Sequence, residues 1–291
     1  MKKSSPKKQL NIQSLKLLAQ ELHTPLELLL EVAEEINSLY SVWEEPKPNG
    51  KFRTISSPKK KLKKIQKAIH NLLITIEPMD CWHCGIKNRS NVINAKVHSG
   101  QKWLLSYDFK DFFPSISYKM VFDMFRHKLN CSPPVAKILT RLSTFQKQVP
   151  QGAPMSMDIA NLVCRPMDIA LKFLAKKNHL NYTRYCDDIF FLGNHISDAF
   201  IDKAKKIIAQ YPFTLNSDKE LLRGNHEPQI VTGLSVNKKR PHFPRGKRRE
   251  WRKEKFFCEK YDFKNLPEEA QIKRKQQFAG RDSYITYINN A

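Results

Sequence analysis

Two short runs of apolar and aromatic residues that flank a pair of adjacent acids constrain this chain most. The runs, 181–184 and 189–192, surround Tyr185-Cys186-Asp187-Asp188, and this pattern predicts a β-hairpin with both carboxylates at its tip. Like charges this close repel each other and raise at least one carboxyl pKa, so a cation is expected nearby. Without further context, an Asp-Asp pair in a turn is more often a simple solvated turn.

A third acid lies where it can join this pair. The run 103–108 predicts a buried strand that ends at Asp108 and lies beside the hairpin. Asp108, Asp187 and Asp188 can then converge on two divalent cations about 3.5 to 4 Å apart. Oxygen ligands favour Mg²⁺, with Mn²⁺ as an alternative, over zinc. The pattern therefore suggests two-metal phosphoryl transfer.

The charge of the chain indicates a polyanionic partner. Its 291 residues hold 51 Lys+Arg and 28 Asp+Glu, a formal net charge of +23. Such a field attracts nucleic acid, with an anionic membrane surface as the simpler alternative. The basic residues concentrate in 51–67 and 238–255, and both segments also contain aromatic residues and prolines. We therefore favour binding of a phosphate backbone over a merely solvated face.

Composition and segment lengths indicate a globular protein of the cytoplasm. Hydrophobic residues make up 41% of the chain, which argues against intrinsic disorder. No run reaches the roughly 18 apolar residues of a membrane span, so no membrane is expected among its partners. The basic start, 1–8, is not followed by the apolar core of a signal peptide. The six scattered cysteines do not resemble a disulfide framework and are expected to be reduced.

Periodicity predicts helices at both ends of the chain and a mixed centre. We expect a helix over 10–22, a second that opens with a capping box at Thr24 and has Pro25 as its first residue, and a turn at 47–50 between two strands. A long helix should follow Ser57-Pro58, with its lysines outside the apolar face. Further strands are expected at 213–215 and 230–232. This order fits an α+β fold in which helices pack on one face of a small antiparallel sheet.

Several motifs together resemble those of reverse transcriptases. Tyr185–Asp188 resembles the YxDD box, with the flanking motifs Asp108–Phe113 upstream and Gln151–Pro154 between them. Arg53–Pro58, followed by 62–66, resembles the fingers motif. Asn216–Lys219 resembles the motif after the active hairpin.

Two further boxes narrow the resemblance. Asn94–His98 matches the NAxxH element and Val231–Gly233 matches the VTG element of bacterial retron reverse transcriptases. No maturase or endonuclease motif follows, which disfavours a group II intron protein. The resemblance implies a right-hand polymerase with a helical N-terminal cap (1–45), fingers (46–100), a palm with interleaved fingers elements (101–237) and a basic, RNA-binding helical thumb (238–291).

The resemblance also implies roles for individual residues. Asp108, Asp187 and Asp188 would form the catalytic metal site for two Mg²⁺ ions, completed by the backbone carbonyl of Phe109. The residues expected to bind the nucleotide are Arg53 at the triphosphate, Phe113 under the sugar, Gln151 and Gly152 through their backbone, and Lys219 at the leaving pyrophosphate. The residues expected to contact RNA are Lys63, Lys64, Lys67, Asn94, His98, Arg245, Lys247, Arg248, Arg249 and Arg252. For His98 a structural role is the alternative.

The implied activity is that of a retron. Such an enzyme binds a cognate noncoding RNA, primes from a 2′-hydroxyl of a guanosine in that RNA, and uses dNTPs to copy part of it into multicopy single-stranded DNA (msDNA). Removal of the template would need a host RNase H, and an effector protein would complete an antiphage defence system. The alternatives are another bacterial defence reverse transcriptase, with protein or untemplated priming, and an RNA-binding antitoxin scaffold with a vestigial polymerase.

A few positions depart from the family pattern or invite another interpretation. Met155 and Met157 stand where Thr or Ser and Pro are commoner in the motif that begins at Gln151. Cys186, in the variable position of YxDD, is interpreted as a small hydrophobic residue. Cys81 and Cys84 form one CxxC pair, which cannot close a tetrahedral zinc site without a second pair and lacks the βαβ context of a thioredoxin motif.

Overall fold

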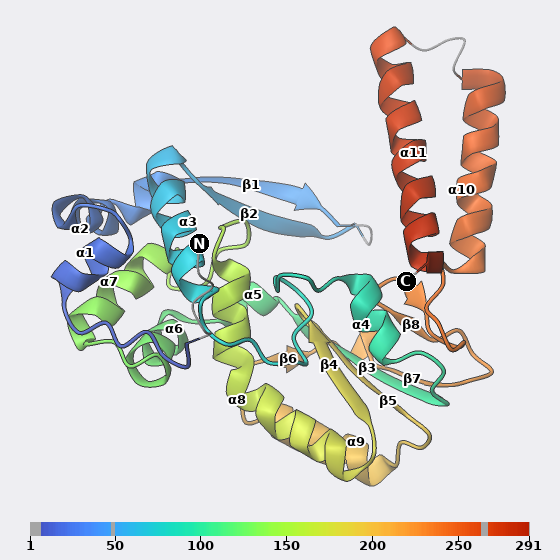
Figure 1. Ribbon diagram of the computed structural model, residues 1–291, viewed down its shortest axis with the longest axis horizontal. Helices are drawn as coiled ribbons and strands as arrows, with labels where there is room; N and C mark the ends of the chain where they lie inside the picture. Colours follow the sequence, from blue (N-terminus) through green and yellow to red (C-terminus); the bar gives the residue numbers. More distant parts are fainter. Residues whose placement is uncertain (1–6, 48–49, 263–266, 291) are drawn as a thin grey trace.

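The computed structural model describes residues 7–47, 50–262 and 267–290 of this chain. Helices from the N-terminal half gather on one side, an antiparallel sheet occupies the centre, and two long C-terminal helices project from the sheet (Figure 1). Among the described residues, no helix combines the length and apolar character needed to cross a bilayer. The expectations for residues 1–6 and for Pro48 and Asn49 lie outside the described residues.

The helical lobe joins two separate stretches of the chain. Its members are α1 (Leu15–Glu21), α2 (Leu26–Glu34), η1 (Ile36–Leu39), α3 (Lys60–Leu73), α6 (Tyr118–Asp123), η2 (Met124–Lys128) and α7 (Pro133–Ser143). Backbone hydrogen bonds from Leu10 to Leu129 (3.0 Å) and from Ser132 to Ile12 (3.0 Å) join the two stretches. Inside the lobe, the buried amide of Gln66 donates to the hydroxyl of Tyr40 at 2.7 Å. The N-terminal helices therefore share a core with residues that follow the first strand of the sheet.

Two helix starts differ from the prediction. The first helix begins at Leu15 rather than near residue 10, because Ser14 caps it by accepting from the amide of Leu17. The capping box at Thr24 is wrong: Pro25 is the N-cap, and the Thr24 hydroxyl donates instead to the carbonyl of Leu22 at 2.9 Å.

A β-hairpin leads from this lobe into the long helix α3. Its strands are β1 (Tyr40–Pro46) and β2 (Phe52–Pro58), paired antiparallel. A hydrogen bond from the Lys47 amide to the Lys51 carbonyl (2.6 Å) closes the turn. In α3 the apolar face is buried and the lysines predicted to lie outside it, Lys63, Lys64 and Lys67, are exposed.

The central sheet is antiparallel and contains the predicted hairpin. Its strands are β3 (Trp103–Lys110), β4 (Asn181–Tyr185), β5 (Asp188–Gly193), β6 (Thr214–Leu215) and β7 (Leu221–Gly224). The order is β4-β5-β3, with β6 and β7 both paired to β3. The register sets Asp108 opposite Asp188 and Tyr185 opposite Asp188. The acids predicted at the tip of the hairpin therefore lie beside Asp108 of β3.

Both faces of this sheet are covered, whereas the sequence predicted helices on one face only. α8 (Ser156–Lys177) and α9 (Asp198–Ile208) belong to the core that contains Leu105 and Phe191. On the opposite face, Leu104 and Phe190 pack with α4 (Asn91–Val97) and with the small ribbon of β8 (Ile230–Val231) and β9 (Leu234–Ser235). Neighbouring strand residues point to opposite faces, so an uninterrupted apolar run such as 189–192 needs a cover on each side.

The C-terminal helix pair, α10 (Arg245–Phe257) and α11 (Glu268–Asn290), stands away from the sheet (Figure 1). Its base is held by the second core, where Phe243 stacks near Trp251 (ring centroids 4.4 Å apart) and Ile288 is buried. The remaining short helices are α5 (Phe112–Ser115), η3 (Ser217–Lys219) and η4 (Cys258–Asp262).

Candidate active site

The three predicted acids lie together at one edge of the sheet. β4 and β5 are joined by the two residues Cys186 and Asp187, and Cys186 takes the left-handed conformation (φ 60°) that such tight turns require. The amide of Phe109 donates to the carbonyl of Asp187 at 3.2 Å, which fastens the turn to β3. This backbone pairing places the side chains of Asp108, Asp187 and Asp188 at a common edge, as the sequence predicts.

The carboxylates at this edge carry unbalanced negative charge. Burial, followed by repulsion from Asp187 and Asp108, raises the pKa of Asp188 to about 7. Burial and the charge of Asp108 also raise the pKa of Asp187. A cation bound here would therefore be stabilised strongly.

One cation of the chain already contacts this group. The Nζ of Lys219 donates to Oδ2 of Asp108 at 2.9 Å, and Nδ2 of Asn216 donates to Oδ1 at 3.2 Å. This hydrogen bond with Asp108 raises the pKa of Lys219. Asn216 had no assigned role in the sequence analysis, although it opens the motif to which Lys219 belongs.

The chemistry of the acids suits a hard divalent cation, but their side chains do not form a complete ligand set in this structure. The three acids offer oxygen donors, which suit Mg²⁺ or Mn²⁺. Within the part of the chain that the structure describes, no three His, Cys, Asp or Glu side chains are grouped closely enough to hold a metal as they stand. Lys219 pairs with Asp108 in this arrangement, so metal binding requires the carboxylates to turn toward one another.

The hairpin β1–β2 reaches the segment that precedes α8. The amide of Ser56 donates to the carbonyl of Gln151 at 2.8 Å. Next to it, Gly152 has φ +120°, and a Cβ there would lie 3.1 Å from Ile55 and 3.2 Å from the Ser56 carbonyl oxygen, so glycine is required. Arg53, on the same hairpin, is half-exposed and paired with Glu45 at 2.7 Å, an ion pair that it would have to leave to bind a triphosphate.

Phe113 lies in the first turn after β3. It is half-buried against Phe112, with ring centroids 5.4 Å apart, and it follows Asp111, whose backbone is left-handed (φ 44°). The departures at Met155 and Met157 are accommodated: Met155 is fully buried, and Met157 lies against Gly85, where a Cβ would come within 2.6 Å of its Cγ.

The prediction of direct RNA contacts by Asn94 and His98 needs correction. Both side chains have 0% exposure, because α4 packs them against the sheet. Nε2 of His98 is hydrogen-bonded to the hydroxyl of Thr183 in β4 at 2.6 Å. These two side chains are therefore internal, and the structural alternative for His98 fits its position.

The NAxxH and VTG elements meet in the second core, where Ala95 and Val231 are both buried, and Asn91, just before the first element, bonds to the second. The hydroxyl of Thr232 donates to the carbonyl of Asn91 at 2.9 Å, and the amide of Asn91 donates to the Thr232 carbonyl at 3.3 Å. The same amide donates to the hydroxyl of Tyr284 in α11 at 2.5 Å. The two elements thus form one junction between the sheet and the C-terminal helix pair.

We predict that His98 makes the protein sensitive to acid. Burial, with a smaller effect of His83, lowers the pKa of His98 to about 3. The contribution of neutral His98 to stability is therefore complete above its ordinary pKa of 6.5 and is lost as the pH falls toward 3, by at most about 1.4 kcal/mol per pH unit. His98→Gln should flatten the decrease in urea midpoint between about pH 7.5 and about pH 5, whereas the exposed His195→Gln should leave it unchanged.

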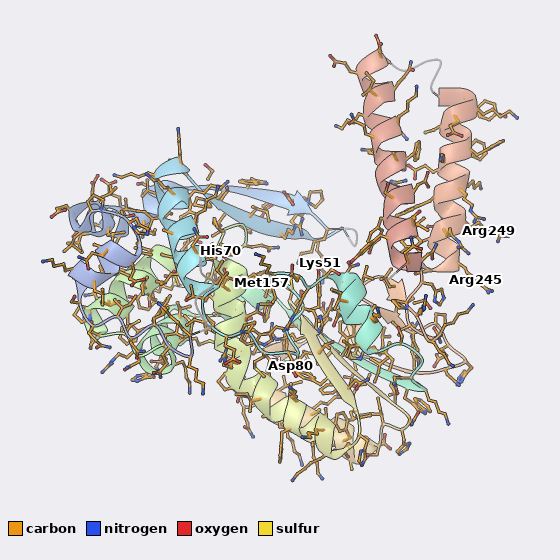
Figure 2. All side chains as sticks on the ribbon, in the orientation of Figure 1. Lys51, His70, Asp80, Met157, Arg245 and Arg249 are labelled. Carbon is orange, nitrogen blue, oxygen red and sulfur yellow. The ribbon has the colours of Figure 1, made fainter. Side chains whose placement is uncertain are left out.

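The basic residues of α10 lie mainly on the surface. Arg245, Lys247, Arg249 and Arg252 are exposed and Arg248 is half-buried. Figure 2 shows Arg245 and Arg249 on the side of α10 that faces away from α11. These positions are open to a large anionic ligand.

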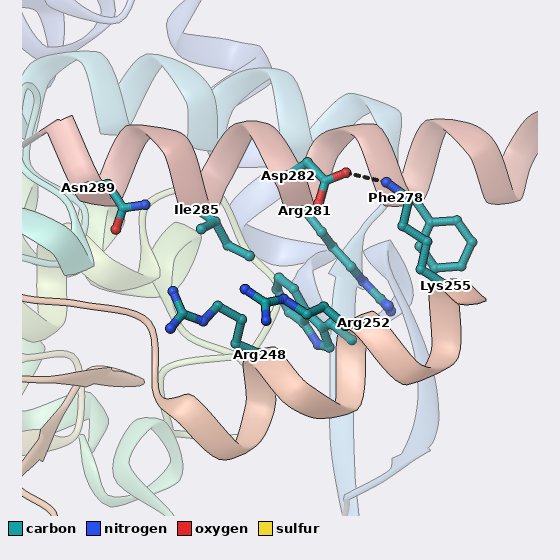
Figure 3. A pocket seen from close by; sticks show the side chains of 9 residues that line it. Arg248, Arg252, Lys255, Phe278, Arg281, Asp282, Ile285 and Asn289 are labelled. Atoms are coloured by element: carbon teal, nitrogen blue, oxygen red, sulfur yellow. Dashed lines mark hydrogen bonds and ion pairs between the residues drawn. The ribbon is translucent and has the colours of Figure 1, made fainter. Parts of the chain in front are cut away.

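A cavity of about 260 Å³ lies between α10 and α11 (Figure 3). It is lined by Arg248, Trp251, Arg252, Lys255, Phe278, Arg281, Asp282, Ile285 and Asn289. Asp282 accepts from Lys255 at 2.7 Å, and the guanidinium of Arg281 lies over the ring of Trp251, 4.9 Å from its centroid. Arg281 was missed by the sequence analysis because it lies outside both basic segments.

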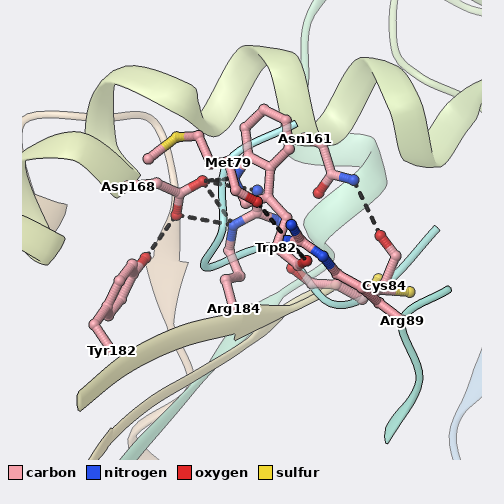
Figure 4. A network of polar contacts seen from close by, with 9 residues as sticks. Met79, Trp82, Cys84, Arg89, Asn161, Asp168, Tyr182 and Arg184 are labelled. Carbon is pink, nitrogen blue, oxygen red and sulfur yellow. Dashed lines mark hydrogen bonds and ion pairs between the residues drawn. The ribbon is translucent and has the colours of Figure 1, made fainter. Parts of the chain in front are cut away.

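A buried polar network supports the β4–β5 hairpin (Figure 4). Asp168 in α8 and Arg184 in β4 are both 0% exposed and paired at 2.8 Å. Asp168 also accepts from the Nε1 of Trp82 and from the hydroxyl of Tyr182, each at 2.6 Å. Arg184 in turn donates to the carbonyl of Cys186 at 3.0 Å. The network therefore fixes the residue just before the paired acids.

Comparison with known proteins gives the class of polymerase to which this sheet, with three acids at one edge, belongs. Residues 45–228 match the family described as "Reverse transcriptase (RNA-dependent DNA polymerase)". A structure of telomerase from Candida albicans, in complex with a fragment of telomeric RNA, shares the fold at a TM-score of 0.50 and 14% identity, over 69% of this chain and 45% of that one.

Curated relatives narrow the class. The chain is 30% identical to the Ec86 retron reverse transcriptase of Escherichia coli over 242 residues, 81% of this chain and 74% of that protein. It is 30% identical to the Mx162 enzyme of Myxococcus xanthus over 68% of this chain, and 31% identical to the Se72 enzyme of Salmonella heidelberg over 73% of it. These matches span 47% and 58% of those longer relatives. The chain belongs to the reverse transcriptases, the RNA-directed DNA polymerases, and within them to the retron enzymes.

Proposed function

We propose that this enzyme copies part of a cognate noncoding RNA into msDNA, primed from a 2′-hydroxyl of that RNA. The observation that carries the proposal is the common edge of Asp108, Asp187 and Asp188, whose mutual repulsion calls for divalent cations. It is supported by the junction of the two retron elements, because this junction attaches the basic helix pair to the catalytic sheet.

In the proposed reaction the chain holds and positions the reactants. Asp108, Asp187 and Asp188, with the carbonyl of Phe109, would hold two Mg²⁺ ions, which supply activation of the attacking oxygen and stabilisation of the leaving group. Lys219 would move from Asp108 to the pyrophosphate and neutralise or protonate it.

The remaining side chains would select and orient the nucleotide. Arg53 would exchange Glu45 for the triphosphate, and the backbone at Gln151 and Gly152 would contact nucleotide and template. We propose that the phosphate backbone of the RNA lies along α3 at Lys63, Lys64 and Lys67. It would continue along α10 at Arg245, Lys247, Arg248, Arg249 and Arg252. Both surfaces are basic and open, which suits recognition of RNA by shape and phosphate contacts.

The proposed setting is a cytoplasmic antiphage system. A host RNase H would remove the copied template, and an effector protein would act with the RNA–DNA product. The assignment of residues 1–45 as cap, 46–100 as fingers, 101–237 as palm and 238–291 as thumb is part of the same proposal. It is supported by the helix pair, which stands apart from the sheet.

We predict that Phe113 selects deoxynucleotides. Its ring follows Asp108 closely in the chain and is half-buried, so it can occupy the space that a 2′-hydroxyl would need. Phe113→Ala should raise ribonucleotide incorporation relative to deoxynucleotide by about 10- to 200-fold in primer extension. The matched variant Phe173→Ala removes a ring that is 60% exposed on α8 and should leave discrimination unchanged. Equal discrimination by both variants would remove Phe113 as a gate.

The function itself is tested by the nature of the product. The chain is expressed with its flanking noncoding DNA, and the nucleic acid that copurifies is digested with DNase or RNase. A DNA species whose mobility shifts after RNase, and which is absent from the Asp187→Asn/Asp188→Asn double variant, supports RNA-primed synthesis. DNA linked to protein supports protein priming instead. RNA alone in both preparations supports the scaffold function.

A further inference from the structure

Two cysteines meet at the catalytic hairpin. Residues 81–84 run alongside β4, with the backbone of Arg184 donating to Cys81 (2.9 Å) and that of His83 donating to Arg184 (3.2 Å). Trp82 and Arg184 form a parallel bridge, so two residues further along, Cys84 falls opposite Cys186. Their side chains are close enough to interact, and this interaction lowers the pKa of the Cys84 thiol.

The two thiols differ from the other cysteines of the chain. Cys81, Cys131, Cys164 and Cys258 are buried, whereas Cys84 and Cys186 are both partly exposed. The CxxC motif therefore does not act as a pair, because Cys81 points into the core and Cys84 turns to the hairpin.

Both partners are held firmly by the surrounding backbone. Nδ2 of Asn161 donates to the carbonyl of Cys84 at 3.1 Å (Figure 4), and Arg184 donates to the carbonyl of Cys186 at 3.0 Å. The backbone thus holds the two cysteines at adjacent positions, which suits the Cα separation that a disulfide needs.

We propose that Cys84 and Cys186 form an oxidation site that switches the polymerase off. A peroxide oxidises the pair: each thiol loses one hydrogen, the S–S bond forms, and the O–O bond of hydrogen peroxide breaks to give two waters. A dithiol such as dithiothreitol reverses the step by exchange and is itself oxidised to a disulfide.

The bond affects catalysis because Cys186 directly precedes Asp187. A disulfide draws the sulfurs from contact distance to about 2.05 Å, and the turn residue must move with them. A displacement of the order of 1 Å at a catalytic group costs about 100-fold in rate. This consequence rests on the proposed role of Asp187, whereas formation of the bond does not.

The test uses the purified full chain with a pre-annealed DNA primer on an RNA template. After treatment with hydrogen peroxide, the rate of dNTP addition should fall by about 100-fold and return with dithiothreitol. Peptide mapping without reduction should find Cys84 linked to Cys186. Cys84→Ser should extend the primer normally and keep its rate after peroxide, and Cys258→Ser, which removes a buried thiol of the thumb, should lose activity as the unmodified chain does.

Each outcome decides a separate point. Equal loss of activity in Cys84→Ser, or no linked peptide in the unmodified chain, overturns the inference. If peptide mapping finds Cys84 linked to Cys186 but primer extension is not lost, the pair is an oxidation site but does not switch the polymerase off. Because the primer is supplied, a failure of RNA 2′-hydroxyl priming in the product analysis leaves both readouts intact.

Discussion

Asp187→Asn is expected to reduce primer extension by at least about 1,000-fold. The change keeps the shape of the side chain but removes one of the charges that would hold the metal ions, and it thereby removes several kcal/mol of transition-state stabilisation. The side chain is half-buried in a turn whose backbone is fixed to β3 by the hydrogen bond from Phe109, so the turn itself should persist. Single-turnover addition of one dNTP to a supplied primer, over a range of Mg²⁺ concentrations, measures the effect.

The matched control is Asp198→Asn. Asp198 is exposed at the start of α9, beyond the end of β5 opposite to the paired acids, and the same chemical change there should leave the rate unchanged. Binding of RNA should remain in both variants, because the basic faces of α3 and α10 are separate from this edge. If Asp187→Asn keeps more than a tenth of the rate, the metal site must be elsewhere.

The hairpin could be predicted because its information is local. The apolar and aromatic runs and the two-residue turn at 186–187 determine where the strands end, and the strand that ends at Asp108 was expected beside them. The long helix α3 was predictable for the same reason, since its buried and exposed faces repeat with the helical period. Such features need no knowledge of the distant chain.

The errors arose where distant residues decide the environment. The RNA contacts of Asn94 and His98 were implied by the family resemblance, and their polarity agreed with a surface position, because polar side chains are mostly exposed. Their burial depends on packing between α4 and β4, which lie more than eighty residues apart. The pairing of Lys219 with Asp108 was not predicted for the same reason, since it depends on the packing of η3 against β3, and the role of Lys219 at the pyrophosphate stays a prediction.

The buried pair of Asp168 and Arg184 carries the second large prediction. Asp168→Asn should lower the free energy of unfolding by about 3 to 5 kcal/mol, because it leaves the fully buried guanidinium without a counter-ion. Urea unfolding measures this loss. The matched variant Asp80→Asn breaks the pair with Lys172 at the surface, where Asp80 is 71% exposed, and should cost less than about 1 kcal/mol. Equal losses of stability in the two variants would contradict the role of Asp168 as the counter-ion of the buried Arg184.

A double variant separates the stability of this network from its role in positioning the hairpin. Asp168→Asn with Arg184→Met removes both buried charges, so much of the lost stability should return, because no buried charge is left without a counter-ion. Primer extension should nevertheless stay low, because the carbonyl of Cys186 has lost its donor and the turn before Asp187 is no longer fixed. A double variant with normal stability and normal extension would show that Arg184 serves the fold alone.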